Sequence, residues 1–208
     1  MRRADEIIVE KIPIQQTWEA MEEIVDEGLA KDIGLRYDGL LRYTGGEKGA
    51  DLSLSFSNFN GALLSDVLRY ATKPVSVLQI EHHPYLTQDK LINSVKSEGI
   101  AITAYSSFGP ASWVEFEHQN VPDLLNHDTI RNISEATGKT PPQVLLRWAT
   151  QRGIAVIAKS INENRLLEYL QSSDFYLTQE QIDRISALDI NLRFYDPYDI
   201  DSRLFIFA

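Results

Sequence analysis

The chain has no cysteine among its 208 residues. That absence excludes disulfides, thiolate metal sites and cysteine nucleophiles. Positive charge is also scarce, since 30 acidic residues against 20 basic ones give a formal net charge of −10. Binding to nucleic acid requires a basic surface, so the composition argues against nucleic acid as a partner.

Long apolar runs are missing as well. No segment approaches the ~18 consecutive apolar residues of a membrane span, and the charged N-terminus has no apolar core of signal-peptide length. The hydrophobic fraction of 43% and the charged fraction of 24% are ordinary for a globular protein with one sizeable core. We therefore expect a cytoplasmic protein that is not bound to a membrane.

Short apolar runs alternate with helical patterns along the chain. The predicted strands are residues 31–35, 75–83, 100–109 and 154–160, and the predicted helices are residues 13–30, 61–71, 87–99, 128–138, 140–153, 161–171 and 177–189. Strands separated by helices predict βαβ units and a parallel sheet, an α/β fold. Open doubly wound sheets and (β/α)8 barrels are both built in this way, and four strands are half of such a barrel.

Two helices carry strong start signals. Thr140, Pro141 and Gln143 form a capping box with the favoured proline at the first helical position. Thr178 and Gln181 form a second capping box.

One region interrupts the alternation of strands and helices. Residues 36–56 hold four of the eleven glycines and have no steady period. The segment is long for a connection between a strand and a helix. We interpret it as an atypical surface insertion.

Polar side chains gather where the predicted strands end, which is where α/β proteins place their sites. They are Ser57, Asn58, Gln79, Glu81, His82, Tyr105, Ser106, Ser107, Lys159 and Ser160. The set suits an amide-bearing ring that is held by hydrogen bonds and stacked on Tyr105.

Lys159 and Ser160 end the last predicted strand, Arg165 lies five residues further on, and the three suit an anion. Ser160 is predicted to cap the next helix with Glu163 as its N3 partner, and the free N–H groups there favour negative charge. Arg165 adds a planar fork that matches phosphate. The alternative is a plain capping box beside a lysine and a solvated arginine, and the residues alone leave both interpretations open.

The remaining candidates are weaker. His82 and His83 are adjacent on a strand and point to opposite faces, so they do not share a metal ion, and we predict no metal site. One should be a satisfied core histidine and the other should face the site. Glu115 is either a solvated carboxylate or a partner of ribose hydroxyls.

Several long strings in the chain resemble the aldo-keto reductases, and among these the yeast and fungal D-xylose reductases. They are "SNFNGALLSDVLR", "KPVSVLQIEHHPYL", "GIAITAYSSFGP", "TPPQVLLRWATQRGIAVIAKS" and "LRFYDP". The resemblance covers about residues 10–34 and 57–208. It implies the C-terminal half, about strands 5–8, of a (β/α)8 TIM barrel that binds NADPH or, as the alternative, NADH.

The resemblance also implies roles for individual residues. Ser57, Asn58 and Gln79 would hold the nicotinamide carboxamide, and Tyr105 would stack on the nicotinamide ring. Other residues would line the pyrophosphate path (Ser106, Phe108, Ser112), contact the ribose on the adenine side (Glu115) and bind the 2′-phosphate and adenosine (Lys159, Ser160, Arg165). Residues 190–208 would form the C-terminal tail on the substrate side.

Departures from the family pattern limit these expectations. The family's catalytic aspartate, tyrosine, lysine and histidine lie in the first half of the barrel, so no catalytic residue is assigned in this chain. Residues 1–208 are expected to be a single, partial reductase domain, and a retained intron or a faulty gene boundary would explain both the insertion and the missing half. Ile161, Tyr169, Tyr195 and Tyr198 replace polar or tryptophan residues of the family.

The implied activity is reduction of an aldehyde or aldose to its alcohol, as in the conversion of D-xylose to xylitol. The partner would be a small-molecule aldose. The alternatives are a non-catalytic remnant, which two copies could complete as a homodimer, and a regulatory nucleotide-binding module.

Overall fold

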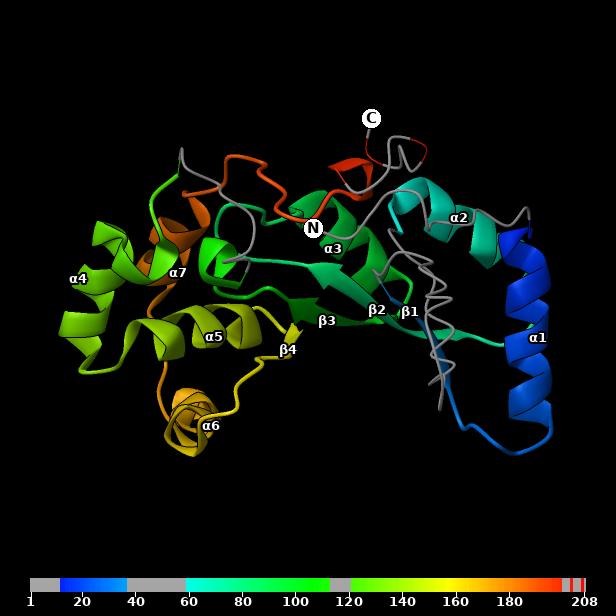
Figure 1. Cartoon of the computed structure of the whole chain (residues 1–208), viewed down its shortest axis with the longest axis horizontal. Coiled ribbons are helices and arrows are strands. Elements are labelled where there is room, and N and C mark those ends of the chain that lie inside the picture. The colour runs from blue at the N-terminus through cyan, green and yellow to red at the C-terminus, as the bar shows by residue number, and fades with distance from the viewer. Residues whose placement is uncertain (1–11, 37–58, 113–120, 200–202, 204–206, 208) are drawn as a thin grey trace, which may run out of the picture. The chain divides into compact units, whose positions relative to one another are not determined.

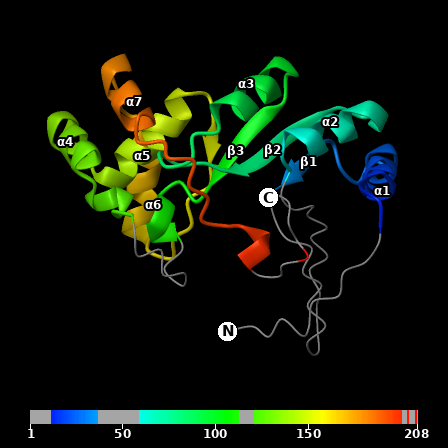
Figure 2. The same cartoon turned by 90° about the horizontal axis from the view of Figure 1, so that it is seen from above.

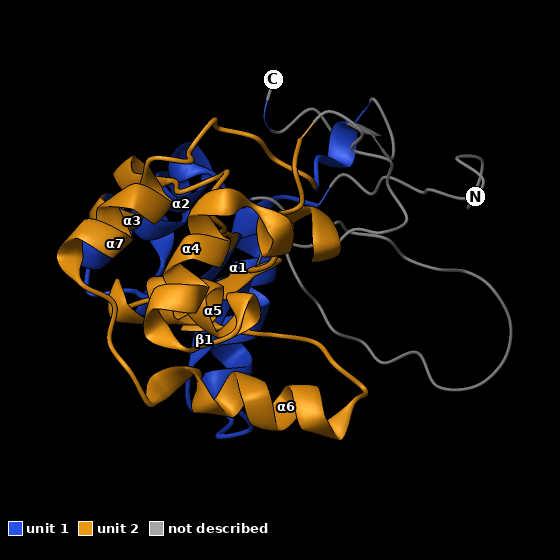
Figure 3. Ribbon diagram, turned by 90° about the vertical axis from the view of Figure 1, so that its left-hand side faces the viewer, with its two compact units in different colours: residues 1–80, 94–101, 195–208 blue, residues 81–93, 102–194 orange. Residues whose placement is uncertain are grey.

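The computed structural model describes residues 12–36, 59–112, 121–199, 203 and 207 (Figure 1). The chain divides into two compact units that interleave along the sequence (Figure 3). Unit 1 comprises residues 1–80, 94–101 and 195–208, and unit 2 comprises residues 81–93 and 102–194. Of the predicted insertion at 36–56, only Arg36 is among the described residues.

Strands and helices alternate as the sequence predicts. In chain order the principal elements are α1 (Ile14–Asp26), β1 (Ile33–Arg36), α2 (Gly61–Tyr70), β2 (Val75–Glu81), α3 (Asp89–Ser97), β3 (Ala101–Tyr105), α4 (Asp128–Thr137), α5 (Pro141–Gln151), β4 (Ala155–Val156), α6 (Glu163–Leu170) and α7 (Gln179–Ser186). Short 3-10 turns lie at Gly109–Ser112, Leu124–Asn126, Gln171–Ser173 and Pro197–Asp199. No helix in the described ranges has the length and hydrophobicity to cross a membrane.

The strand pairs are parallel, as predicted. β1 pairs with β2, with Leu35 opposite Leu78. β3 pairs with β4, with Ala104 opposite Val156. β4 is shorter than the predicted strand at 154–160, although the N–H of Ile157 still donates to the carbonyl of Ala104 at 3.0 Å.

A glycine is required where β1 approaches β2. A Cβ atom on Gly34 would lie 2.3 Å from Cγ1 of Val77 and 2.8 Å from the carbonyl oxygen of Val77. Val75, Leu78 and Ile80 of β2 are all buried. A side chain at position 34 would therefore clash with β2 beside this buried part of the sheet.

Unit 2 has a core built by its helices. α4, α5 and α7 pack together (Figures 1 and 2). The buried apolar side chains at their centre include Ile130, Ile133, Leu145, Trp148 and Ile185. Both predicted capping boxes are present, because Thr140 and Gln143 exchange hydrogen bonds at the start of α5 and Thr178 and Gln181 do so at the start of α7.

Candidate cofactor-binding site

The carboxyl end of β3 carries the first group of predicted site residues. Tyr105 is the last residue of the strand and is half-buried. Ser106 has a left-handed backbone with φ of 57°, which is uncommon for a residue with a side chain. Its carbonyl accepts a hydrogen bond from the N–H of Gly109 at 2.8 Å. The strand therefore ends in a tight turn.

The turn after β3 packs against Leu124 and the core of unit 2. Gly109 has φ of 59°, and a Cβ atom there would lie 2.6 Å from Cδ1 of Leu124. Phe108 packs against the core of unit 2, while Ser112 at the end of the turn is exposed. These contacts hold Ser106 and Phe108 at the carboxyl end of β3.

The residues after β4 lie at the same end of the pair, because β3 and β4 are parallel. Lys159 and Arg165 are both exposed. Within the described part of the chain neither cation makes an ion pair. Both side chains are open to solvent, and the anion site at these residues stays a prediction.

Ser160 does not cap the helix, so that prediction is wrong. Asn162 is the N-cap of α6, and its side-chain oxygen accepts from the N–H of Arg165 at 3.2 Å. The hydroxyl of Ser160 instead accepts from the N–H of Asn162 at 3.1 Å. Serine and asparagine are about equally favoured as caps, and the turn made by Ser160 shifts the start of the helix by two residues.

An aromatic contact joins the turn after β3 to α6. The ring centroids of Phe108 and Tyr169 lie 5.3 Å apart at an angle of 47°. Burial raises the pKa of the Tyr169 hydroxyl, the Arg165 cation opposes this rise and Glu168 adds to it, so that the pKa lies above its ordinary value. No sequence pattern indicates this pairing, because the two residues are 61 positions apart and belong to different elements.

The other predicted cofactor residues lie in unit 1 or outside the described residues. Gln79 lies in β2, half-buried, and belongs to unit 1. Ser57, Asn58 and Glu115 lie outside the described residues. Their assignments stay predictions.

The two adjacent histidines are both fully buried. The ring of His82 stacks on that of Trp148 with the two centroids 4.7 Å apart, and Nε2 of His82 lies 3.0 Å from Nη1 of Arg152. His83 lies with its Nε2 2.9 Å from Oε1 of Glu81. The expectation of a core histidine is met, whereas neither ring is exposed as a site-facing histidine should be. The described residues include no group of side chains that could hold a metal ion.

Comparison with known proteins places these residues in a family. The sequence model described as "Aldo/keto reductase family" matches residues 47–190. The chain belongs to the aldo/keto reductase family. This membership confirms the resemblance seen in the strings around β2, β3 and β4.

Two relatives are about half identical to the chain. The NADPH-dependent D-xylose reductase of Meyerozyma guilliermondii is 50% identical over 200 residues, which are 95% of this chain and 56% of that protein. The NAD(P)H-dependent D-xylose reductase I,II of Candida tropicalis is 48% identical over 201 residues, with the same two shares. The chain thus spans about half the length of the curated relatives it matches.

A solved structure confirms the predicted fold class. The aldose reductase from Schistosoma japonicum superimposes with a TM-score of 0.74 at 29% identity. The match covers 93% of this chain and 53% of that one. The α/β chain therefore has the fold of part of an aldo-keto reductase (β/α)8 barrel.

Proposed function

We propose that this chain forms the cofactor-holding part of an NADPH-dependent aldose reductase that converts D-xylose to xylitol. The observation that carries the proposal is the 50% identity over 200 residues to an NADPH-dependent D-xylose reductase. NADPH would supply the hydride that reduces the aldose carbonyl. The residues of this chain would bind and orient the nucleotide.

The arrangement in unit 2 fits the adenosine end of such a nucleotide. Lys159 and Arg165 present two exposed cations beside the start of α6. The side chain of Asn162 satisfies one helical N–H, which leaves the two cations as the main attraction for a phosphate. Arg165 suits the 2′-phosphate because its guanidinium makes paired hydrogen bonds to phosphate oxygens.

Tyr105 and Ser106 fit the path from the phosphates to the nicotinamide. Tyr105 ends β3 with its ring half-buried, and the left-handed Ser106 turns the chain immediately after it. An aromatic face beside a turn with polar atoms suits a ring joined to a pyrophosphate. We propose that Gln79, Ser57 and Asn58 hold the nicotinamide carboxamide, and that Glu115 contacts the ribose on the adenine side.

Nucleotide titration of two charge-removing variants tests the proposal. Charged hydrogen bonds contribute roughly 1.5–3 kcal/mol, so Lys159→Ala and Arg165→Ala should each weaken NADPH binding about tenfold or more. Binding of NADH, which lacks the 2′-phosphate, should change by no more than about twofold. The measurement is quenching or enhancement of cofactor fluorescence.

Arg184→Ala removes an exposed arginine from α7 and serves as the matched control. Absence of NADPH binding to the unaltered chain would refute the proposal. Equal losses for NADPH and NADH in Arg165→Ala would refute the 2′-phosphate contact alone. Xylose-dependent oxidation of NADPH then tests whether the chain itself turns over substrate.

A further inference from the structure

Residues 189–194, which end unit 2, are hydrogen-bonded to the turn that follows β2. The carbonyl of Tyr85 accepts hydrogen bonds from the N–H groups of Ile190 at 3.4 Å and Leu192 at 2.9 Å. The hydroxyl of Thr87 donates to Oδ2 of Asp189 at 2.5 Å. Residues more than a hundred positions apart are thus held in register just before the C-terminal tail begins.

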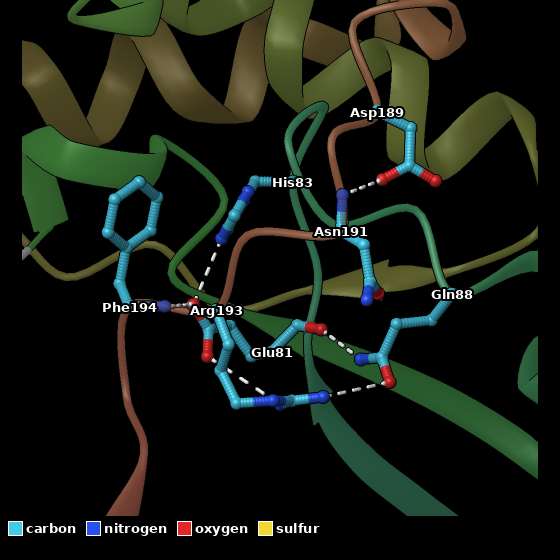
Figure 4. A network of polar contacts seen from close by, with 7 residues as sticks. All are labelled: Glu81, His83, Gln88, Asp189, Asn191, Arg193 and Phe194. Atoms are coloured by element: carbon cyan, nitrogen blue, oxygen red, sulfur yellow. Dashed lines mark hydrogen bonds and ion pairs between the residues drawn. The ribbon is translucent and has the colours of Figure 1, made fainter. Parts of the chain in front are cut away.

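Glu81 lies at the centre of this attachment (Figure 4). Its carboxylate is fully buried. Oε1 accepts from the N–H of Phe194 at 2.8 Å and lies 2.9 Å from Nε2 of His83. Oε2 faces Nη1 of Arg193 at 3.7 Å. Arg193 and Phe194, the last two residues of unit 2, therefore converge on one carboxylate.

Gln88 closes the network from the other side (Figure 4). Its Nε2 donates to the carbonyl of Glu81 at 2.6 Å, and its Oε1 accepts from Nη2 of Arg193 at 3.3 Å. Its backbone is left-handed, with φ of 51°. Such a conformation persists only where surrounding contacts hold it, and here the side chain bonds to both Glu81 and Arg193.

The energetics couple the carboxylate to the segment that covers it. A buried charge is costly unless it is paired and hydrogen-bonded. Arg193 supplies an opposite charge to Glu81, and Phe194 supplies a backbone donor together with a ring 5.0 Å from His83. Loss of either partner should loosen residues 189–194, whereas β2 should stay folded.

We propose that Glu81 is a positioning residue that fixes the point from which the C-terminal tail, residues 195–208, leaves unit 2. Glu81 follows Gln79 by two positions in β2. In the proposed reductase the tail lies on the substrate side, so this attachment governs affinity for the aldose and not for the nucleotide. The effect on aldose affinity rests on the proposed function, whereas the positioning of the tail does not.

Four variants of the whole chain test the coupling. Arg193→Ala removes the half-buried partner, Glu81→Gln removes the buried charge while keeping its size, and the double variant removes both. Arg193→Lys retains a cation and is the conservative variant. Arg184→Ala, which removes an exposed arginine of α7, is the control for loss of one positive charge.

Chymotrypsin cleavage after the aromatic residues from Phe194 onward reports the freedom of the tail. Loss of a charge-assisted contact should raise the cleavage rate about tenfold in Arg193→Ala and in Glu81→Gln. The double variant should be cleaved no faster than the faster single variant, because both changes break one network. Arg193→Lys should stay close to the unaltered protein, as should Arg184→Ala.

Cleavage of Arg193→Ala at the rate of Arg184→Ala would overturn the proposal, even if Glu81→Gln fails to fold. A cleavage rate in the double variant that equals the product of the two single effects would also overturn the proposal. The second readout is kinetic: the KM for xylose should rise in Arg193→Ala while NADPH affinity and kcat are retained. Absence of NADPH binding would refute the proposed function, whereas a chain that binds NADPH without turnover would not, and in both cases the cleavage result decides the positioning of the tail.

Discussion

At the scale of single residues, the buried carboxylate of Glu22 connects α1 by hydrogen bonds to the residues just before β2 in unit 1. Glu22 accepts from Nε1 of Trp18 at 2.7 Å and from the backbone N–H groups of Thr72 at 2.6 Å and Lys73 at 2.8 Å. Burial alone would raise the pKa of Glu22, but the hydrogen bonds from Lys73, Thr72 and Trp18 outweigh it and lower the pKa. The charged form of this side chain is therefore the native form.

Replacement of this carboxylate by an amide should destabilise the chain and change its response to acid. Glu22→Gln should lower the free energy of unfolding by about 1–3 kcal/mol, because the new NH2 group faces donors. With a lowered folded pKa, the stabilisation is present above the ordinary value of 4.5 and is lost as the pH falls through the folded value.

Urea unfolding between pH 7 and pH 3 measures both effects, and Glu23→Gln, at an exposed neighbour, is the control. The stability difference between Glu22→Gln and the unaltered protein should shrink toward pH 3. A difference that stays constant with pH would show that the charge of Glu22 does not contribute.

The residue scale also shows where sequence reasoning fails. Lys159 and Arg165 lie exposed where the sequence places an anion site. The cap of α6 is Asn162 rather than Ser160, because two good capping residues stand two positions apart and propensity does not choose between them. The contact between Phe108 and Tyr169 depends on tertiary packing, which has no periodic signal in the sequence.

At the scale of elements, the strength of the local signal decides what is predictable. α5 and α7 begin where their capping boxes place them. β4 is reduced to Ala155–Val156, although the apolar run continues beyond it, because strand length depends on a neighbour and not on the run itself. Gly34 within β1 marks a close backbone approach that only the pairing with β2 explains.

The packing of β1 on β2 predicts a large effect of one methyl group. Gly34→Ala would place Cβ 2.3 Å from a side-chain atom and 2.8 Å from a backbone oxygen of Val77. We expect a loss of about 1–3 kcal/mol in the free energy of unfolding, since overpacking forces the backbone to move. Thermal or urea unfolding measures the loss.

The double variant with Val77→Ala separates the two contacts. It removes the side-chain clash but leaves the clash with the carbonyl oxygen, so it should remain less stable than Val77→Ala alone. Equal stability of these two variants would show that the backbone accommodates a Cβ at this position.

At the scale of the whole molecule, the order of strands and helices and the α/β class followed from alternation alone. The strings around β2, β3 and β4 indicated the family, which the comparisons confirm. The attachment of Phe194 to Glu81 could not be predicted, because it joins residues 113 positions apart through a backbone N–H that any residue except proline could donate. Long-range polar contacts of this kind depend on the finished fold.

Because the chain has a net charge of −10, its affinity for an anionic nucleotide should depend on the salt concentration. The acidic chain should repel an anionic ligand at long range, whereas in the proposed site the cations Lys159 and Arg165 would attract its phosphates locally. NADPH that binds only the native state at a hundred times its Kd should add about 2.7 kcal/mol to stability. For a chain of this size that corresponds to a rise of roughly 5–10 °C in the unfolding midpoint.

Calorimetry with NADPH or NADH, each at a hundred times its Kd at low salt, measures this rise. When salt is then increased at the same ligand concentrations, salt weakens the local attraction more than it relieves the long-range repulsion, so the rise with NADPH should shrink. The rise with NADH should change less, because NADH lacks the 2′-phosphate. An equal salt effect on both cofactors, or a rise with NADPH that grows with salt, would show that the two exposed cations do not hold the extra phosphate.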